Sequence, residues 1–305
     1  MDIEKFEKIK ILVVGDIMLD KYIIGDVSRI SPEAPVPIVN VKEEYSTLGG
    51  SGNVLRNIKE LGVQVDCLSS IGNDIEGKII IDKLNEIGAN SLLCFGSEKT
   101  TVKERVIAEH RLVQMLRIDR EVQAPVDVNL AIQKLQEIDP DEYNMIVVSD
   151  YAKGMITMEL MNYLKENQTA KIIVDPKPKN GYMYNDVFMI TPNKKEWLEM
   201  QASSRYVLDN VQYILQTMGK DGMLLIEGEE TYEIKAEPVE IYNVSGAGDT
   251  VIAIMAVCLS VGLQPYIAAK FANQCANYVV TQPGTSVVPK NKFMNVLQRY
   301  IHGEF

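Results

Sequence analysis

The apolar residues of this chain cluster in short runs separated by longer amphipathic stretches. The first run, Ile11–Val14, has four consecutive aliphatic residues and ends at Gly15 and Asp16. Runs this short, bounded by turn residues, are typical of strands buried on both faces of a sheet. Similar runs predict strands at 65–69, 145–149, 171–174, 187–190 and 223–226, and helical spacing predicts helices over 53–61, 76–87, 128–137, 158–167, 194–200 and 207–218. This alternation indicates an α/β fold in which helices cover both faces of a parallel sheet.

Two segments, 21–48 and 99–120, do not fit this alternation. The first contains three prolines between strand-like pieces such as Pro37–Val41, and the second alternates polar and apolar residues as a strand does. We expect both segments to form a small accessory β-sheet, which could serve as a lid over a site or as a dimer surface. A pair of surface hairpins is the alternative. Because no linker-like tract interrupts the chain, residues 1–305 are expected to form one domain with this β appendage.

A glycine-rich loop precedes the longest apolar run, Val251–Val261. Gly246, Ala247 and Gly248 stand directly before Asp249, so the sequence predicts a tight loop that opens a buried helix. Such a loop directs backbone N–H groups and the positive end of the helix dipole at one point, where an anion is stabilised. An anion site beside a carboxylate indicates phosphoryl transfer to a hydroxyl, with Asp249 as the base. A simple N-cap role for Asp249 is the alternative.

Composition and charge narrow the classes of partner. The 305 residues carry a net charge of −11, and no basic stretch stands out against this acidic background. Nucleic acid is therefore not expected as a partner, and an anionic substrate would need a local cluster of Lys and Arg. No apolar run is long enough to span a bilayer, so no membrane partner is expected. The charged N-terminus lacks the apolar core of a signal peptide, and the four cysteines lack metal-type spacing. We expect a cytoplasmic protein with reduced thiols.

Polar residues follow several predicted strands at the positions where the strands end. Asp16 and Asp20 follow the first strand, and Asp150, Asp175 and Asn193 follow later ones. Ligands in open α/β sheets bind at the carboxyl ends of the parallel strands, so these side chains are candidates for one shared site. Each could instead be an ordinary turn or cap residue.

Four motifs, in order, resemble those of the ribokinase-like, or PfkB, carbohydrate kinases. They are GGSGN at 49–53, NKKE at 193–196, TMGKDG at 217–222 and GAGD at 246–249, and the resemblance covers almost the whole chain. It implies a ribokinase-like three-layer α/β/α sandwich with a mostly parallel sheet and a small accessory β-sheet lid. It also implies an enzyme that uses ATP and Mg²⁺ to phosphorylate a sugar hydroxyl, and a homodimer formed through the lid.

Other segments are similar to one branch of that family, the D-glycero-β-D-manno-heptose-7-phosphate kinases. These segments are GDIMLD at 15–20, SRISPEAPVP at 28–37, SDYAKG at 149–154 and DPK at 175–177. The resemblance implies phosphorylation of O1 of the heptose 7-phosphate to the 1,7-bisphosphate, on the way to ADP-heptose. Many members of that branch are fused to an adenylyltransferase domain. This sequence contains no second nucleotide-binding motif, so we expect the kinase alone.

On the nucleotide side, the resemblance assigns a role to each motif residue. Asp249 would be the catalytic base, and backbone N–H groups of Gly246, Ala247 and Gly248 would stabilise charge on the transferring phosphoryl group. Asn193 and Glu196 would organise Mg²⁺ and the phosphates, mostly through water, although a helix capping box is the alternative. The residues expected to line the nucleotide are Thr217, Gly219, Gly222, Asn273 and Asn277.

On the sugar side, hydroxyl groups need carboxylate and amide partners, and a substrate phosphate needs cations. Lys103 and Arg105 alternate along one predicted strand and therefore share a face. Lys153 and Lys177 follow core strands, and Arg29 from the lid is a fifth cation; a solvated surface role is the alternative for each. The expected substrate-binding residues are Asp16, Asp20, Gly49, Gly50, Asn53, Lys103, Arg105, Asp150, Lys153 and Lys177.

One position departs from the family pattern. Asn243 stands where the family usually has an Asp, which can ligate an activating K⁺ in ribokinase-like enzymes. A neutral amide binds a cation less well than a carboxylate does, so this residue argues against K⁺ activation. Two other functions stay open: a kinase of another sugar, sugar phosphate or nucleoside, and a non-catalytic sugar or nucleotide sensor that kept the fold.

Overall fold

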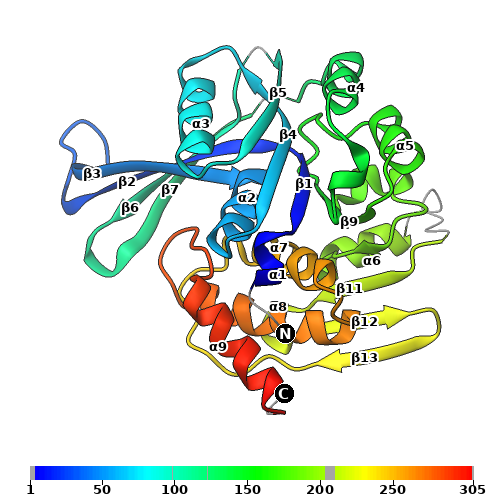
Figure 1. The fold of residues 1–305 in the computed structure, drawn as a ribbon. Helices are drawn as coiled ribbons and strands as arrows, with labels where there is room; N and C mark the ends of the chain where they lie inside the picture. The colour runs from blue at the N-terminus through cyan, green and yellow to red at the C-terminus, as the bar shows by residue number, and fades with distance from the viewer. Residues whose placement is uncertain (1–3, 98, 122, 203–209, 304–305) are drawn as a thin grey trace.

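The computed structural model describes residues 4–97, 99–121, 123–202 and 210–303. Its main element is a nine-stranded sheet with the order β13-β12-β11-β10-β9-β8-β1-β4-β5 (Figure 1). From β11 to β5 in this order the neighbouring strands run parallel, whereas β12 and β13 are added antiparallel. The strands are β1 (Lys10–Gly15), β4 (Gln64–Gly72), β5 (Asn90–Ser97), β8 (Met145–Ser149), β9 (Lys171–Asp175), β10 (Met189–Ile190), β11 (Tyr213–Thr217), β12 (Met223–Glu227) and β13 (Glu230–Ile234).

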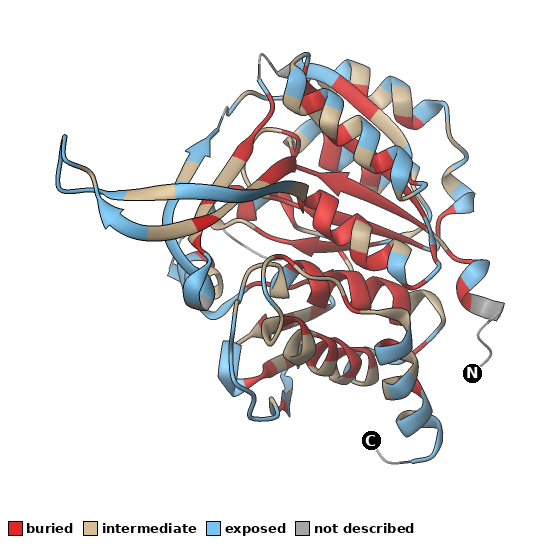
Figure 2. Cartoon of the chain, turned by 90° about the vertical axis from the view of Figure 1, so that its left-hand side faces the viewer, coloured by how far each residue is buried: buried red, intermediate tan, exposed pale blue. Residues whose placement is uncertain are grey.

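Helices cover both faces of this sheet, and the side chains of β1 show why. Ile11 and Val13 belong to one apolar core and Leu12 and Val14 to the other, because successive residues of a strand face opposite ways. The buried strands accordingly run through the middle of Figure 2. The first core is covered by α2 (Ser51–Glu60), α3 (Ile75–Glu86), α7 (Ala247–Ser260), α8 (Pro265–Val280) and α9 (Lys290–Ile301), and the second by α4 (Val128–Gln136), α5 (Met158–Asn167) and α6 (Lys194–Ala202). The expected three-layer α/β/α sandwich is confirmed.

Short helical segments complete the described chain. None of its helices is long and apolar enough to cross a membrane. The short segments are α1 (Glu4–Glu7) and the 3₁₀ turns η1 (His110–Leu112), η2 (Pro140–Glu142), η3 (Pro178–Met183) and η4 (Gly219–Asp221).

The accessory sheet predicted from segments 21–48 and 99–120 is present. It has four strands in the order β3-β2-β6-β7 and projects from one side of the sandwich (Figure 1). Its outer ends are largely exposed (Figure 2). Only Asp16 separates the end of β1 from the start of β2, and α2 begins directly after Gly50, the last residue of β3. Its strands are β2 (Ile17–Ile30), β3 (Pro37–Gly50), β6 (Val102–Ala108) and β7 (Val113–Arg120).

The helix predicted over 207–218 is wrong. Residues 207–209 lie outside the described residues, and Tyr213–Thr217 forms the strand β11. The apolar spacing of this segment fits a helix, but Tyr213 and Leu215 pack into one core while Ile214 packs against the other. That two-sided burial requires a strand between two helix layers. The outer strands β5 and β13 were not predicted; in β13, polar residues interrupt the apolar pattern.

The strand order places a crevice between β1 and β8. From β1 the chain moves to β4 and β5 on one side, and it later continues through β8, β9 and β10 on the other. The loops that follow β1 and β8 therefore diverge to opposite sides and leave room for a ligand at the carboxyl ends of these strands. Asp16 and Asp150 follow these two strands, as the sequence predicted.

Candidate active site

Asp16 holds the loop that follows β8. Its carboxylate accepts the backbone N–H groups of Tyr151 at 2.8 Å, Lys153 at 3.0 Å and Met155 at 2.9 Å. Burial, together with the nearby Asp150 carboxylate, raises the pKa of Asp16, and these three hydrogen bonds oppose that rise. Asp16 therefore fixes the conformation of the loop after β8, which borders the crevice. Its direct contact with a sugar stays a prediction.

Asp249 lies in the first turn of α7, but it does not cap the helix. The N-cap is Gly246, which has a left-handed φ of 83° and provides no side-chain cap. The Asp249 carboxylate instead accepts the side-chain amide of Asn53 at 2.9 Å and the hydroxyl of Tyr151 at 2.7 Å. A methyl group on Gly246 would lie 2.6 Å from Nδ2 of Asn53, so glycine is required for this approach. The simple N-cap alternative is wrong.

The surroundings of Asp249 set its proton affinity. Its side chain is buried, and burial raises its pKa, which the hydrogen bonds from Asn53 and Tyr151 and the positive charge of Lys177 oppose. A buried carboxylate that keeps two donors and a nearby cation can remain ionised and still have raised basicity. This combination suits a group that takes a proton from a hydroxyl.

The start of α7 has the geometry that the predicted anion site requires. A helix leaves the N–H groups of its first turn without intrahelical acceptors, and a methyl group on Gly248 would meet no atom within 4 Å. That open space lies in a cavity of about 450 Å³, which Ala247 and Gly248 help to line. The N–H of Ala247 already donates to the Val244 carbonyl at 3.3 Å, so it is partly engaged.

The same cavity brings together five of the predicted nucleotide-binding residues, whereas Asn193 and Glu196 are not among its lining residues. Apolar side chains such as Val239 and Val251 form its walls. Asn273 and Asn277 donate to the carbonyls of Lys235 and Glu237, and so they fix the wall opposite α8. A methyl group on Gly222, whose φ is 93°, would lie 2.1 Å from the Ile234 carbonyl oxygen. The predicted residues that line the cavity are Thr217, Gly219, Gly222, Asn273 and Asn277.

A family model for pfkB family carbohydrate kinases matches residues 8–291. The chain belongs to this family. Its fold agrees: phosphofructokinase-2 from Escherichia coli in complex with potassium superposes with a TM-score of 0.78 at 17% identity, covering 96% of this chain and 99% of that one. Ribokinase from Thermotoga maritima gives 0.69 at 19% identity, covering 95% and 99%. At these identities the superpositions establish the ribokinase-like fold alone.

Curated relatives are more similar in sequence. The bifunctional protein HldE of Desulfatibacillum aliphaticivorans is 39% identical over 97% of this chain, and that of Helicobacter hepaticus is 36% identical over 96%. The chain spans 65% and 64% of the length of these two relatives. As a pfkB-family member it is a phosphotransferase that acts on a sugar hydroxyl.

In this pfkB-family kinase, Asn193 and Glu196 form a reciprocal capping box. Glu196 accepts the N–H of Asn193 at 3.0 Å, and Asn193 accepts the N–H of Glu196 at 2.9 Å. The other Glu196 oxygen pairs with the ammonium group of Lys177. The capping alternative is therefore present in the structure. It does not exclude a metal role, because each carboxylate oxygen retains a lone pair for a water molecule.

The predicted phosphate-binding cations are mostly paired with carboxylates. Arg105 forms a buried ion pair with Asp20 at 2.9 Å, Lys153 pairs with Glu121 at 2.6 Å, and Lys177 pairs with Glu196. Lys103 and Arg105 do share a face of β6, opposite Asp20 and Tyr22 of β2. Arg29 lies exposed at the far end of β2, so the structure does not bring it to this site.

Gly49 and Gly50 lie close to other residues of the chain, Asp20 and Asp16. A methyl group on Gly49 would lie 2.8 Å from the carboxylate of Asp20, and one on Gly50 would lie 2.4 Å from the Asp16 carbonyl oxygen. Gly50 also has a left-handed φ of 59°. These contacts explain both glycines without a sugar, so their predicted substrate contact stays a prediction.

Asp150, which follows β8, and Asp175, which ends β9, are both buried near the crevice. Asp150 accepts the N–H of Ala152, the side-chain amide of Asn180 and the hydroxyl of Tyr184. Burial raises the pKa of Asp175 to about 8 although Lys177 opposes it. Within the described residues, no group of three or more His, Cys, Asp or Glu side chains has an arrangement that could hold a metal ion.

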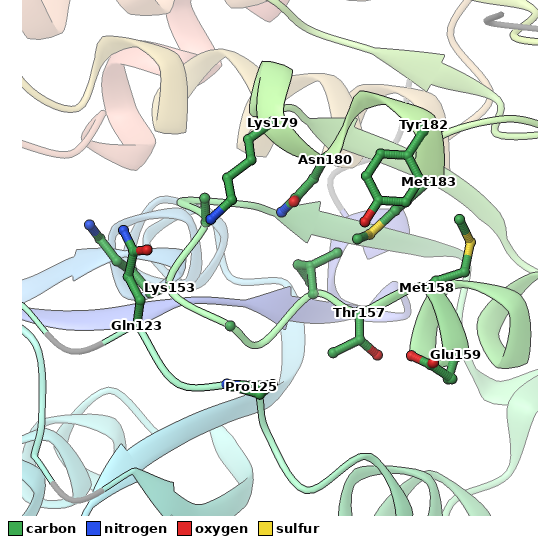
Figure 3. A pocket seen from close by; sticks show the side chains of 13 residues that line it. Gln123, Pro125, Lys153, Thr157, Met158, Glu159, Lys179, Asn180, Tyr182 and Met183 are labelled. Atoms are coloured by element: carbon green, nitrogen blue, oxygen red, sulfur yellow. The ribbon is translucent and has the colours of Figure 1, made fainter. Parts of the chain in front are cut away.

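A cleft of about 440 Å³ opens beside the loop after β8 (Figure 3). Lys153 and Lys179 lie on one side of it, and Glu159 lies on the opposite side. Lys179, which the sequence analysis missed, forms no ion pair with any described residue. Its only sequence signal was its position just after DPK at 175–177.

Tyr151 was also missed. Its hydroxyl contacts Asp249, and the ammonium groups of Lys103 and Lys177 lie 5.4 Å and 5.3 Å from its ring centroid. The available signal was an aromatic residue directly after a strand end, inside the SDYAKG segment at 149–154. Because tyrosine occurs both in protein cores and at surfaces, the residue type alone did not indicate a role at the site.

Proposed function

We propose that this chain is an ATP-dependent kinase that phosphorylates O1 of D-glycero-β-D-manno-heptose 7-phosphate, giving the 1,7-bisphosphate. One observation carries the proposal: the buried Asp249 carboxylate, which is bound by Asn53, directly follows Gly248, and Gly248 lines the cavity. Residues that resemble heptose 7-phosphate kinases, and relatives named bifunctional protein HldE, support this acceptor. The relatives' full activity extends beyond the portion that this chain matches.

The chemistry follows from the positions of Asp249 and the first turn of α7. The acceptor oxygen forms a bond to the γ-phosphorus of ATP while the bond from that phosphorus to the bridging oxygen of ADP breaks. The hydroxyl proton passes to Asp249. Backbone N–H groups at Gly246–Gly248 stabilise the charge on the phosphoryl oxygens, and the helix dipole adds to this effect.

The donor set fits an Mg²⁺ ion held through water. Both oxygens of Glu196 and the amide oxygen of Asn193 already accept one hydrogen bond each, and the lone pair that each oxygen retains can accept a hydrogen bond from a metal-bound water. Magnesium commonly keeps several waters, which these oxygens can accept. When bound, the ion would neutralise negative charge on the nucleotide phosphates.

The test is turnover of heptose 7-phosphate with ATP and Mg²⁺. We expect wild type to release ADP in proportion to acceptor, and Asp249→Asn to lower kcat by roughly 100- to 10,000-fold because the base is lost. Absence of turnover by folded wild type would reject this acceptor. Near-normal activity of Asp249→Asn would reject Asp249 as the base.

A kinase of another, unphosphorylated sugar is the second candidate. The ion pairs of Arg105, Lys153 and Lys177 favour it, since these predicted phosphate ligands are already neutralised. Lys103 and Lys179 remain without an ion-pair partner among the described residues, which favours a phosphorylated acceptor. Comparing kcat/KM for the heptose with and without its 7-phosphate separates the two candidates.

We propose that residues 1–305 form one domain in which the accessory sheet acts as a lid. We also propose that two chains form a homodimer through this sheet. Large apolar side chains on its strands are exposed: Val41 by 48%, Val113 by 50% and Leu116 by 55%. Exposed apolar side chains on the two edge strands of the sheet, β3 and β7, support an association role. Leu116→Glu is expected to shift the mass measured by light scattering from dimer to monomer.

We also propose a cytoplasmic location, because the four cysteines are free and buried.

A further inference from the structure

The Asp249 carboxylate is held at both of its oxygens. Asn53 donates to Oδ2 at 2.9 Å, and the Tyr151 hydroxyl donates to Oδ1 at 2.7 Å. The two donors come from opposite sides of the crevice, Asn53 from α2 and Tyr151 from the loop after β8. A carboxylate bonded at both oxygens cannot rotate without breaking a charge-assisted hydrogen bond.

We propose that Tyr151 is a positioning residue for the base, orienting the Asp249 carboxylate toward the acceptor hydroxyl. This inference rests on the proposed function, in which Asp249 accepts the proton. The Tyr151 hydroxyl leaves each Asp249 oxygen one lone pair for the acceptor, and it fixes the direction in which that lone pair points.

Tyr151 is itself anchored on three sides. Its backbone N–H donates to Asp16 at 2.8 Å, at the junction of the two sheets. Lys177, from the loop after β9, and Lys103, from β6 of the lid, both lie within cation–π range of its ring. The ring therefore has little freedom, and its hydroxyl reaches Asp249 at a fixed place. Lys103 also makes the lid part of this support.

The bond has one direction, from phenol to carboxylate. Burial and the carboxylates of Asp249 and Asp175 raise the pKa of Tyr151 well above its ordinary value. The phenol therefore stays protonated and acts as the hydrogen-bond donor. The charged groups that face Asp249 are Asp20 on β2, Asp175 on β9 and Lys177. None of these replaces the Tyr151 bond, because none donates a hydrogen bond to the Asp249 carboxylate.

Loss of the Tyr151 hydroxyl alone should change the pKa of Asp249 in a predictable direction. The Tyr151 bond lowers the pKa of Asp249, so its removal raises that pKa. A base works in its ionised form, and activity is lost as the pH falls through its pKa. The acid limb of the rate profile must then move to higher pH. A loss of stability alone would not move this limb.

Tyr151→Phe tests the inference, and Tyr143→Phe is the matched control. Tyr143 is also a buried tyrosine that donates to a buried aspartate, Asp66 at 2.6 Å, but this pair lies at the other end of the sheet beside Lys10. For Tyr151→Phe we expect kcat to fall about 10- to 100-fold, part of the contribution of a general base, with acceptor KM changed less than about threefold. The acid limb moves to higher pH. Tyr143→Phe should keep kcat and the acid limb of wild type.

A second measurement does not depend on turnover. Aspartate labelled with ¹³C at the carboxyl carbon reports the Asp249 titration, with the signal assigned by its loss in Asp249→Asn. We expect the Asp249 midpoint to be higher in Tyr151→Phe than in wild type and unchanged in Tyr143→Phe. An unchanged midpoint in Tyr151→Phe, or an equal loss of kcat in Tyr143→Phe, would overturn the inference. If wild type does not turn over the heptose phosphate, the acceptor assignment fails while the titration still decides the role of Tyr151.

If Tyr151→Phe does not fold, labelled wild type answers the same question. Tyrosine carrying ¹³C at its ζ carbon should show a Tyr151 signal that moves with the midpoint of Asp249 and loses this movement in Asp249→Asn. A Tyr151 signal that stays constant through the Asp249 midpoint would overturn the inference.

Discussion

Asn53 donates its side-chain amide to Asp249 at 2.9 Å, although 196 positions separate the two residues in the chain. The contact joins the start of α2 to the start of α7, and it explains why two glycine-containing motifs so far apart belong to one site. Gly246 permits it, because any side chain there would strike the Asn53 amide.

Asn53→Asp would replace this donor with a second carboxylate. Two carboxylates at hydrogen-bond distance cannot both ionise easily, so the pKa of Asp249 would rise further above its ordinary value. Since a base must be ionised, we expect the acid limb of kcat/KM to move to higher pH and the rate at neutral pH to fall. The check is a pH–rate profile of wild type and variant. An unmoved acid limb would mean that the two side chains do not share one proton in the working enzyme.

Two glycines of the nucleotide cavity should respond in opposite ways to alanine. Gly248→Ala places a methyl group in open space, so stability should hold or increase by about 1 kcal/mol through helix propensity, while KM for ATP rises because the methyl occupies the anion site. Gly222→Ala places a methyl group against the Ile234 carbonyl on a backbone with a φ of 93°. It should lower the free energy of unfolding by about 1–3 kcal/mol or more. Urea unfolding and ATP kinetics on both variants measure the two effects. Equal destabilisation by both would contradict the open space at Gly248.

The buried ion pair of Asp20 and Arg105 should matter first for folding. Their side chains are 7% and 10% exposed, and removal of one partner leaves a buried charge, which typically costs about 3–5 kcal/mol. We therefore expect Arg105→Met to lower the free energy of unfolding by that amount, measured by urea titration. Arg117→Met is the control, since Arg117 is 51% exposed and its pair with Asp119 should contribute less than about 1 kcal/mol. If Arg105→Met instead keeps stability and raises only acceptor KM, Arg105 is a substrate ligand.

The sequence was sufficient to predict most elements of the core and many of the residues that gather at its crevice, but it did not predict the strand β11. Buried runs such as Ile11–Val14 and the GAGD loop at 246–249 are local patterns, and local patterns fix strands and helix starts. The partner of each polar side chain was harder to predict. Arg105 pairs with Asp20 and Glu196 closes a capping box, because the tertiary fold decides which groups meet. Tyr151 escaped for the same reason.

Asn243 provides a test of monovalent-cation dependence. Its Nδ2 donates to the Gly284 carbonyl at 3.1 Å, and its Oδ1 accepts the N–H of Ser245 at 2.9 Å. The amide therefore joins the loop before α7 to the loop after α8 through a neutral donor. A carboxylate at this position could not donate to Gly284. The oxygen that replaces Nδ2 would face the Gly284 carbonyl oxygen, and a cation can satisfy these two oxygens.

We therefore expect wild-type activity to differ less than about twofold between K⁺ and a bulky organic cation at equal ionic strength. Asn243→Asp should lower activity without K⁺, because the loop loses a hydrogen bond and gains an unpaired charge, and added K⁺ should restore much of it. Initial rates across a K⁺ titration measure both effects. Asn291→Asp, at an exposed position of α9, is the control for an added carboxylate outside this loop contact. Strong K⁺ activation of wild type would show that Gly284 and its neighbours bind the ion despite the amide.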